Sequence, residues 1–198
     1  MERSNIEKPA LLIIDIVKDN MDPEHPLPIT PFIHRIIPPI NALIKLFREQ
    51  GWPVVFSTDA FHEQDFIFTA RMKPHSLAGT RGAEIADGLD YRPETDTWLP
   101  KPRFSAFFGT GLEKSLHEQE VTLCAVAGIS TNFCVLATVM DALCHDFKAI
   151  LLEDCTASFT ESIQEEILAV YRRNPLYPLF RVASSQDMEE ILLSPGNY

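Results

Sequence analysis

Long apolar runs alternate with segments of helical periodicity along this chain. Residues 10–17 and 121–127 are almost continuously apolar, a pattern typical of strands covered on both faces. Residues 33–50 instead carry apolar side chains at helical spacing, and Gly51 follows as a helix-ending residue. The same patterns predict strands at 53–58, 148–152 and 179–183, helices at 110–118, 132–144 and 160–172, and a loop-rich stretch at 61–97 with a short helical piece near 83–89.

Strands that alternate with helices predict an α/β fold. We expect a three-layer α/β/α sandwich with a mostly parallel central sheet and right-handed crossovers. The chain has 198 residues, of which 45% are hydrophobic, and it shows no internal repeat or linker. This length and composition predict a single domain spanning residues 1–198.

Charge and cysteine usage narrow the functional classes. The formal net charge of −11 makes nucleic acid or an anionic membrane surface an unfavourable partner. No run approaches the ~18 apolar residues of a membrane span, and residues 1–8 are polar, with no signal segment behind them. The four cysteines show no CxxC spacing. We therefore expect a cytoplasmic protein with reduced thiols.

Three polar residues follow, or sit near the end of, predicted strands. Asp15 lies in the first apolar run, Asp59 ends the second strand, and Cys134 follows the strand at 121–127. Ligands of open α/β sheets bind beyond the carboxyl ends of the strands. The three side chains are therefore expected to meet in one crevice.

Cys134 is placed by a tight turn, residues 128–131, in the first turn of the predicted helix. Unpaired backbone N–H groups and the positive end of the helix dipole converge at such a position. They favour a thiolate and can receive an oxyanion, which makes Cys134 a candidate nucleophile. The alternative is a small buried hydrophobe, the usual role of a free cysteine.

Asp15 and Lys101 are the candidate partners of that thiol. A carboxylate in an apolar strand must be paired, raise its pKa or serve as an acid–base group, and a structural ion pair is the alternative. Lys101 lies among prolines and aromatics, although an exposed loop lysine is the alternative. Together the cation would lower the thiol pKa, and the carboxylate would accept the thiol proton and later protonate the leaving amine.

Five segments of the chain, in register, resemble the isochorismatase-like cysteine hydrolases. This superfamily includes nicotinamidases and N-carbamoylsarcosine amidases. The likeness covers nearly the whole chain. The matching segments are Leu-Leu-Ile-Ile-Asp at 11–15, Ser-Thr-Asp at 57–59, Pro-His-Ser-Leu-Ala-Gly-Thr-Arg-Gly-Ala-Glu at 74–84, Lys-Pro-Arg-Phe-Ser-Ala-Phe at 101–107 and Gly-Ile-Ser-Thr-Asn-Phe-Cys-Val at 128–135.

The resemblance implies a catalytic triad of Asp15, Lys101 and Cys134. It also implies a non-proline cis peptide at Ile129–Ser130 and an oxyanion hole formed by the backbone N–H groups of Ser130 and Cys134. The implied activity is hydrolysis of a C–N bond in a small amide, carbamoyl or ureido substrate through a cysteine acyl-enzyme. A homo-oligomer is implied as well.

The nicotinamidase metal motif is incomplete in this chain. Asp59 and His75 match two of its ligands, but Phe61 occupies the middle ligand position and His62 comes one residue late. Two protein ligands plus water make a poor zinc or iron site. We therefore predict no metal and no cofactor. His75 is expected to shape the pocket wall instead.

The pocket differs from that of nicotinamidases in other ways. Asn20 replaces an aromatic residue of many relatives, and the spacing from Lys101 to Phe104 is the short version found in the carbamoylsarcosine amidase and isochorismatase branches. The cysteine favours C–N hydrolysis over two alternatives, an isochorismatase-type ether hydrolase and a non-catalytic binding protein. The predicted substrate-binding residues are Asn20, Phe61, His75, Phe104 and Ile129.

Overall fold

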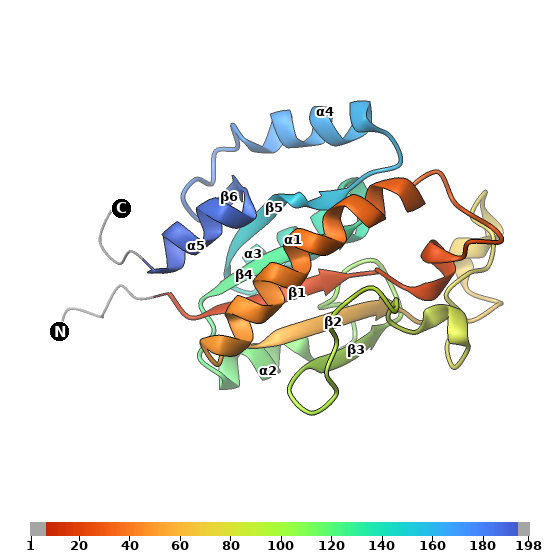
Figure 1. Cartoon of the computed structure of the whole chain (residues 1–198), viewed down its shortest axis with the longest axis horizontal. Helices are drawn as coiled ribbons and strands as arrows, with labels where there is room; N and C mark the ends of the chain where they lie inside the picture. Colours follow the sequence, from red (N-terminus) through yellow and green to blue (C-terminus); the bar gives the residue numbers. More distant parts are fainter. Residues whose placement is uncertain (1–6, 194–198) are drawn as a thin grey trace.

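The computed structural model describes residues 7–193, which contain one six-stranded sheet. The strands lie in the order β3-β2-β1-β4-β5-β6, and every neighbouring pair is parallel (Figure 1). This arrangement confirms the predicted α/β fold. The strands are β1 (Pro9–Ile14), β2 (Val54–Asp59), β3 (Thr97–Lys101), β4 (Leu123–Ile129), β5 (Lys148–Ala157) and β6 (Phe180–Ala183).

Helices cover both faces of the sheet, so the three-layer arrangement is also confirmed. One core packs beneath α1 and α5, and the core on the opposite face receives buried residues of α2, α3 and α4. The helices are α1 (Thr30–Glu49), α2 (Leu112–Glu118), α3 (Leu136–Cys144), α4 (Glu161–Tyr171) and α5 (Ser185–Leu193), and the short helical segments are η1 (Lys18–Met21), η2 (Phe66–Thr69), η3 (Arg81–Ala83) and the π-helical η4 (Thr131–Val135).

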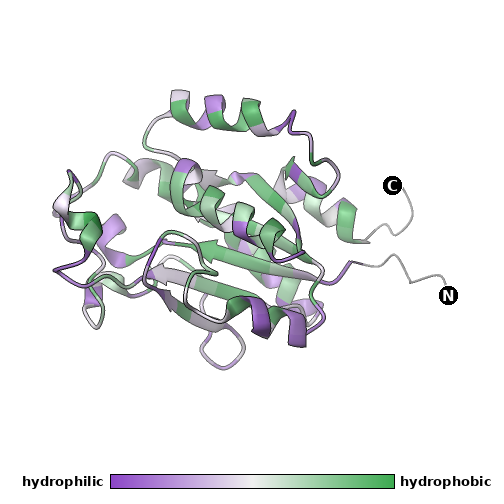
Figure 2. Cartoon of the chain, turned by 180° about the vertical axis from the view of Figure 1, so that it is seen from behind, coloured by the Kyte–Doolittle hydropathy of each residue, from purple (hydrophilic) through white to green (hydrophobic). Residues whose placement is uncertain are grey.

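β1 shows why the central strands read as continuous apolar runs. Leu11 and Ile13 belong to the core beneath α1, whereas Leu12 and Ile14 belong to the opposite core. Both faces of the strand are therefore buried, and a polar residue on either face would be costly. Figure 2 shows the resulting hydrophobic colouring along the central strands and on the helices that cover them.

The order of the strands reverses between β1 and β4, which are neighbours although β2 and β3 separate them in the sequence. Gly128 permits the close approach of these two strands. Its φ is +110°, and a Cβ at this position would lie 2.0 Å from the backbone oxygen of Ile14. The carboxyl ends of β1 and β4 therefore form a topological switch point, where ligands of such sheets bind.

Several elements differ from the sequence-based expectation. β1 ends at Ile14, so Asp15 lies just beyond the strand and not inside it. Neither β3 nor α5 was predicted from the sequence pattern. The helix expected from residue 132 begins with a π-helical turn, and α3 follows it. In the region described by the structure, no helix is long and apolar enough to cross a membrane.

α1 contains two consecutive prolines, Pro38 and Pro39, in its interior. Each lacks the N–H that an uninterrupted α-helix would donate to the carbonyl four residues earlier. The helix continues nonetheless, because it presents a long apolar stripe to the sheet. The buried residues of this stripe are Ile33, Ile36, Ile40, Leu43, Ile44 and Phe47.

Candidate active site

Four polar side chains meet at the carboxyl ends of four adjacent strands. Asp15 follows β1, Asp59 ends β2, Lys101 ends β3, and Cys134 follows β4 within η4. Asp59 and Lys101 are register partners in the parallel pairing of β2 with β3. All four side chains are buried. The predicted convergence of Asp15, Asp59 and Cys134 is therefore observed, and Lys101 joins these side chains.

Asp15 has an unusual backbone conformation, with φ of +54°. A non-glycine residue rarely adopts this left-handed region, and three hydrogen bonds hold it here. Its N–H donates to the Ser57 carbonyl at 2.9 Å, and its own carbonyl accepts from Asn20 Nδ2 at 2.9 Å. The Asp59 N–H donates to Asp15 Oδ1 at 2.8 Å. These contacts fix both the backbone and the carboxylate of Asp15 at the end of β1.

Lys101 is fully buried, with an exposed side-chain fraction of 0%. Its Nζ lies 2.9 Å from Asp15 Oδ2, and it also forms a short contact with Asp59 Oδ1. Burial alone would lower the pKa of this lysine, but the negative charge of its neighbours, that of Asp15 first, outweighs burial and raises it. Lys101 is therefore a permanent cation held between two carboxylates.

Cys134 lies close to both carboxylates. Its Sγ and one carboxylate oxygen each of Asp15 and Asp59 all lie within 4.8 Å of one another. The turn that carries Cys134 is tied to the segment after β3 through Thr138, whose hydroxyl donates to the Cys134 carbonyl at 2.8 Å and accepts the Ala106 N–H at 3.0 Å. The thiol therefore lies within reach of two carboxyl groups.

Lys101 lowers the pKa of the Cys134 thiol, as expected, but the net shift of that pKa is upward. Burial is the largest influence and, with the negative charge of Asp15, it raises the pKa of Cys134 well above its ordinary value. Lys101 acts in the opposite direction, but two carboxylates already compensate its charge. This direction favours the thiol over the thiolate.

Asp59 is also perturbed. Burial, followed by the charge of Asp15, raises the pKa of Asp59 to about 8, although Lys101 opposes both effects. Two carboxyl groups close together next to one cation do not ionise independently. The cluster therefore binds a proton more readily than isolated carboxylates do.

The turn before Cys134 has the expected cis peptide at Ile129–Ser130. The Ser130 carbonyl accepts the N–H groups of Phe133 at 3.0 Å and Val135 at 3.3 Å. These two amides are already engaged, so they are poor candidates for binding an oxyanion. Their pairing is compatible with the expectation that Ser130 and Cys134 supply the oxyanion donors, which stays a prediction.

The other predicted pocket residues lie around this cluster in different roles. Asn20 contacts the backbone of Asp15, so it supports the carboxylate directly. Ile129 is buried at the end of β4. Phe104 lies half-buried beside Phe133 and lines an apolar groove of about 320 Å³ that runs along η4 and α3. Contact of these residues with a substrate stays a prediction.

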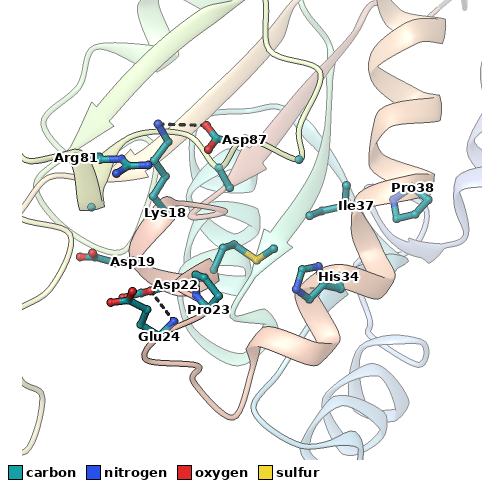
Figure 3. A pocket seen from close by; sticks show the side chains of 14 residues that line it. Lys18, Asp19, Asp22, Pro23, Glu24, His34, Ile37, Pro38, Arg81 and Asp87 are labelled. Atoms are coloured by element: carbon teal, nitrogen blue, oxygen red, sulfur yellow. Dashed lines mark hydrogen bonds and ion pairs between the residues drawn. The ribbon is translucent and has the colours of Figure 1, made fainter.

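A larger cavity, of about 810 Å³, lies beside η1, the first half of α1 and η3 (Figure 3). Its charged lining residues are largely paired: Lys18, for example, forms ion pairs with Glu84 at 2.7 Å and Asp87 at 3.2 Å. None of the four clustered residues lines this cavity. It is therefore separate from the cluster of Asp15, Asp59, Lys101 and Cys134.

Comparison with known proteins identifies the fold family. A model of the isochorismatase domain matches residues 9–182 of the chain. The chain belongs to the isochorismatase family. A maleamate amidohydrolase of Pseudomonas putida is 30% identical over 155 residues, which cover 75% of this chain and 71% of that protein.

Two further relatives show the breadth of the isochorismatase family. An Arabidopsis thaliana protein named "Probable inactive nicotinamidase" is 31% identical over 164 residues, covering 78% of this chain and 83% of that protein. The crystal structure of N-carbamoylsarcosine amidase from Thermoplasma acidophilum has a TM-score of 0.77 at 28% identity, covering 90% of this chain and 96% of that chain. The chain is thus an isochorismatase-family hydrolase.

The residues at the nicotinamidase-type metal position of this isochorismatase-family protein do not fit a metal. Phe61 is buried, and its ring packs against Phe68 and His75 with centroid distances of 5.5 Å each. His75 Nδ1 contacts the Lys73 carbonyl at 2.9 Å. His62 is exposed, and Asp59 contacts Lys101 instead of a histidine. Phe61, Phe68 and His75 therefore form an aromatic cluster at the position of the nicotinamidase metal ligands.

Gln164 is a supporting residue that sequence analysis missed. Its Oε1 accepts the hydroxyl hydrogens of Thr131 at 2.7 Å and Ser158 at 3.0 Å, and its Nε2 donates to the Thr156 carbonyl at 3.1 Å. Thr131 opens η4, so Gln164 connects α4 and β5 to the turn that carries Cys134. The available signal was a polar residue four positions before the buried Leu168 on the same helix face.

Replacing Gln164 with leucine should destabilise the protein and slow turnover. The buried polar groups of Thr131, Ser158 and Thr156 would lose their partner, at a cost of about 1–3 kcal/mol in the free energy of unfolding. We expect kcat to fall more than KM rises, because the change affects the turn that carries Cys134 and not the predicted substrate-binding residues. Denaturant titration and steady-state kinetics test this, with the exposed Gln119→Leu as control. Wild-type kcat in Gln164→Leu would show that the turn needs no such support.

Proposed function

We propose that this protein is a cysteine-dependent amidohydrolase that cleaves a C–N bond in a small amide, carbamoyl or ureido substrate. The observation that supports this best is the buried cluster, in which the thiol of Cys134 lies beside the carboxylate of Asp15. The pairing of Asp15 with Lys101 supplies the rest of the triad. The relatives named for maleamate and N-carbamoylsarcosine hydrolysis, both C–N cleavages, support the substrate class.

Acylation begins with the thiol, because the resting sulfur is protonated. Asp15 accepts the proton of Cys134 as Sγ attacks the substrate carbonyl carbon, and the carbonyl oxygen becomes an oxyanion. The backbone amides of Ser130 and Cys134 stabilise that oxyanion. When the C–N bond breaks, Asp15 returns the proton to the departing nitrogen, and the acyl group remains on Cys134 as a thioester.

Deacylation reverses these roles. The ionised Asp15 accepts a proton from a water molecule, whose oxygen attacks the thioester carbonyl. The second tetrahedral intermediate releases the acid and returns the proton from Asp15 to the sulfur. Lys101 keeps Asp15 available as a base, since its cation stabilises the ionised carboxylate in a site with little solvent.

An ammonia-release screen tests the proposal. The purified protein is incubated with small primary amides, carbamoyl compounds and ureides, and ammonia is measured against Cys134→Ala. Release that depends on Cys134 supports the proposal. Cleavage of a vinyl ether by both proteins would instead indicate the isochorismatase-type ether hydrolase. The relative named as probably inactive motivates the other alternative, a binding protein that retains the fold.

Turnover should survive exhaustive chelation. The expected metal ligands do not converge: Phe61 cannot coordinate, and His75 is engaged with the Lys73 carbonyl. Backbone oxyanion donors are effective without an ion, since losing one donor in comparable enzymes costs about 10²–10³ in rate. Hydrolysis is measured before and after a strong chelator, and again after addition of zinc, iron or manganese. Activity that disappears and returns only with metal would contradict this expectation.

A further inference from the structure

The cluster contains one more charged residue than the predicted triad. Asp59 has no assigned role in the acylation or deacylation steps, yet it is buried and contacts the side chain of Lys101. In nicotinamidases the corresponding position is implied to bind a metal. In this chain the other donors of that site are absent or turned away, so Asp59 has a different partner.

Asp59 makes two kinds of contact with the triad. Its carboxylate holds the ammonium of Lys101, and its backbone N–H donates to Asp15 Oδ1 at 2.8 Å. The pairing of β2 with β3 places Asp59 and Lys101 side by side, so this contact follows from the sheet itself. Asp15 Oδ1 is occupied by the Asp59 amide, and Asp15 Oδ2 remains for Lys101 and for the thiol proton.

We propose that Asp59 is a positioning residue of the catalytic cluster, which holds the Lys101 ammonium against Asp15 and away from the sulfur of Cys134. The inference rests on the proposed amidohydrolase function. It adds Asp59 to the three residues of the triad. Asp59 matches a metal-ligand position of nicotinamidases, but here its side chain contacts Lys101.

The charge count of the site explains why such a residue is useful. With Asp15 alone, the buried lysine could pair with the carboxylate or with a thiolate. A lysine–thiolate pair would draw the ammonium away from Asp15, and the carboxylate would lose the ion pair that holds it in place for both proton transfers. A carboxyl oxygen of Asp59 accepts a hydrogen bond from the ammonium of Lys101, which leaves Asp15 as the acceptor of the thiol proton. Proton transfer then coincides with attack on the substrate.

The experiment compares Asp59→Ala with Asp59→Asn. The alanine variant removes the carboxylate but keeps the backbone N–H to Asp15, whereas asparagine also keeps an oxygen that can accept from Lys101. We expect kcat of Asp59→Ala to fall by about 10²-fold, the typical effect of a misplaced catalytic group, with KM little changed. The kcat of Asp59→Asn should fall less, and the exposed Glu118→Gln should have the kcat of the wild type.

Alkylation of Cys134 provides a second measurement that needs no substrate. Iodoacetamide labelling at neutral pH is followed by mass spectrometry, with the exposed Cys144 as internal reference. Asp59→Ala should accelerate alkylation of Cys134, by about threefold for each unit by which its thiol pKa falls, since the thiolate fraction rises while its intrinsic nucleophilicity falls, and it should slow turnover. Faster labelling with slower turnover is the signature of the proposed role, because a merely structural defect would expose all buried thiols, including Cys124.

The possible results separate this inference from the proposed function. If the wild type releases no ammonia from any substrate, the proposed function fails, and the labelling rates still decide the role of Asp59. Unchanged kcat and unchanged labelling in Asp59→Ala would overturn the inference. It would also be overturned if zinc restored a chelated wild type but not Asp59→Asn, because Asp59 would then be a metal ligand. Should Asp59→Ala fail to fold, Asp59→Asn carries both measurements.

Discussion

Replacing Cys134 with alanine should reduce hydrolysis by about 10⁶-fold, the loss seen when a nucleophile that acts with its base is removed from a comparable enzyme. No other described thiol can substitute. Cys124 lies within β4 and Cys155 within β5, while Cys144 is exposed at the end of α3. The sulfur of Cys134 alone belongs to the cluster with Asp15 and Asp59.

The control for this result is Cys144→Ala, which removes an exposed thiol from the adjacent helix and should leave kcat unchanged. Steady-state kinetics on the best substrate of the ammonia screen measure both variants, and thermal unfolding confirms that they remain folded. Trapping of an acyl-enzyme by mass spectrometry in the wild type, and its absence in Cys134→Ala, would identify the attacking atom. Undiminished turnover in Cys134→Ala would show that the thiol is incidental.

Replacing Lys101 with methionine should damage both stability and catalysis. The substitution preserves the length of the side chain but leaves the buried carboxylates of Asp15 and Asp59 without a cation. Breaking a buried ion pair by removing one partner costs about 3–5 kcal/mol of stability. We expect kcat to fall by about 10²–10⁴-fold, since the acid–base function of Asp15 depends on its ionised state.

A double variant separates these two effects of Lys101. Lys101→Met combined with Asp59→Asn removes one buried negative charge along with the cation, so part of the lost stability should return. Activity should not return, because Asp15 still lacks its partner. Denaturant unfolding and kcat are compared among the single variants, the double variant and the exposed Lys114→Met. Recovery of activity together with stability would mean that Lys101 serves only the fold.

Sequence reasoning located the central strands because their two buried faces require continuous apolar runs. The same logic placed Asp15 and Cys134 together, since parallel strands end at one edge of the sheet. It missed β3, whose residues Thr97 and Trp98 are exposed and which pairs only with β2 at the edge of the sheet. Residues 97–101 therefore carry no apolar run, and Lys101 could not be assigned to a strand end.

The direction in which the pKa of Cys134 shifts could not be predicted from its neighbours in the sequence. A helix start favours a thiolate, and that inference used only the residues around Cys134. The pKa of Cys134 is raised by burial and by Asp15, which lies more than one hundred residues away in the sequence. The support from Gln164 was missed in the same way, because its position on the face of Leu168 does not reveal its partners, which lie in η4 and β5.

The two interior prolines of α1 influence how this fold is reached. Each proline costs about 3 kcal/mol in a helix interior, more than the helix propensities of its neighbours can offset. Residues 30–49 alone should therefore have little helical structure in water. Packing of its apolar stripe on β5, β1, β4 and β2 stabilises the helix in the folded protein. We therefore expect α1 to form as it packs on the sheet and not ahead of it.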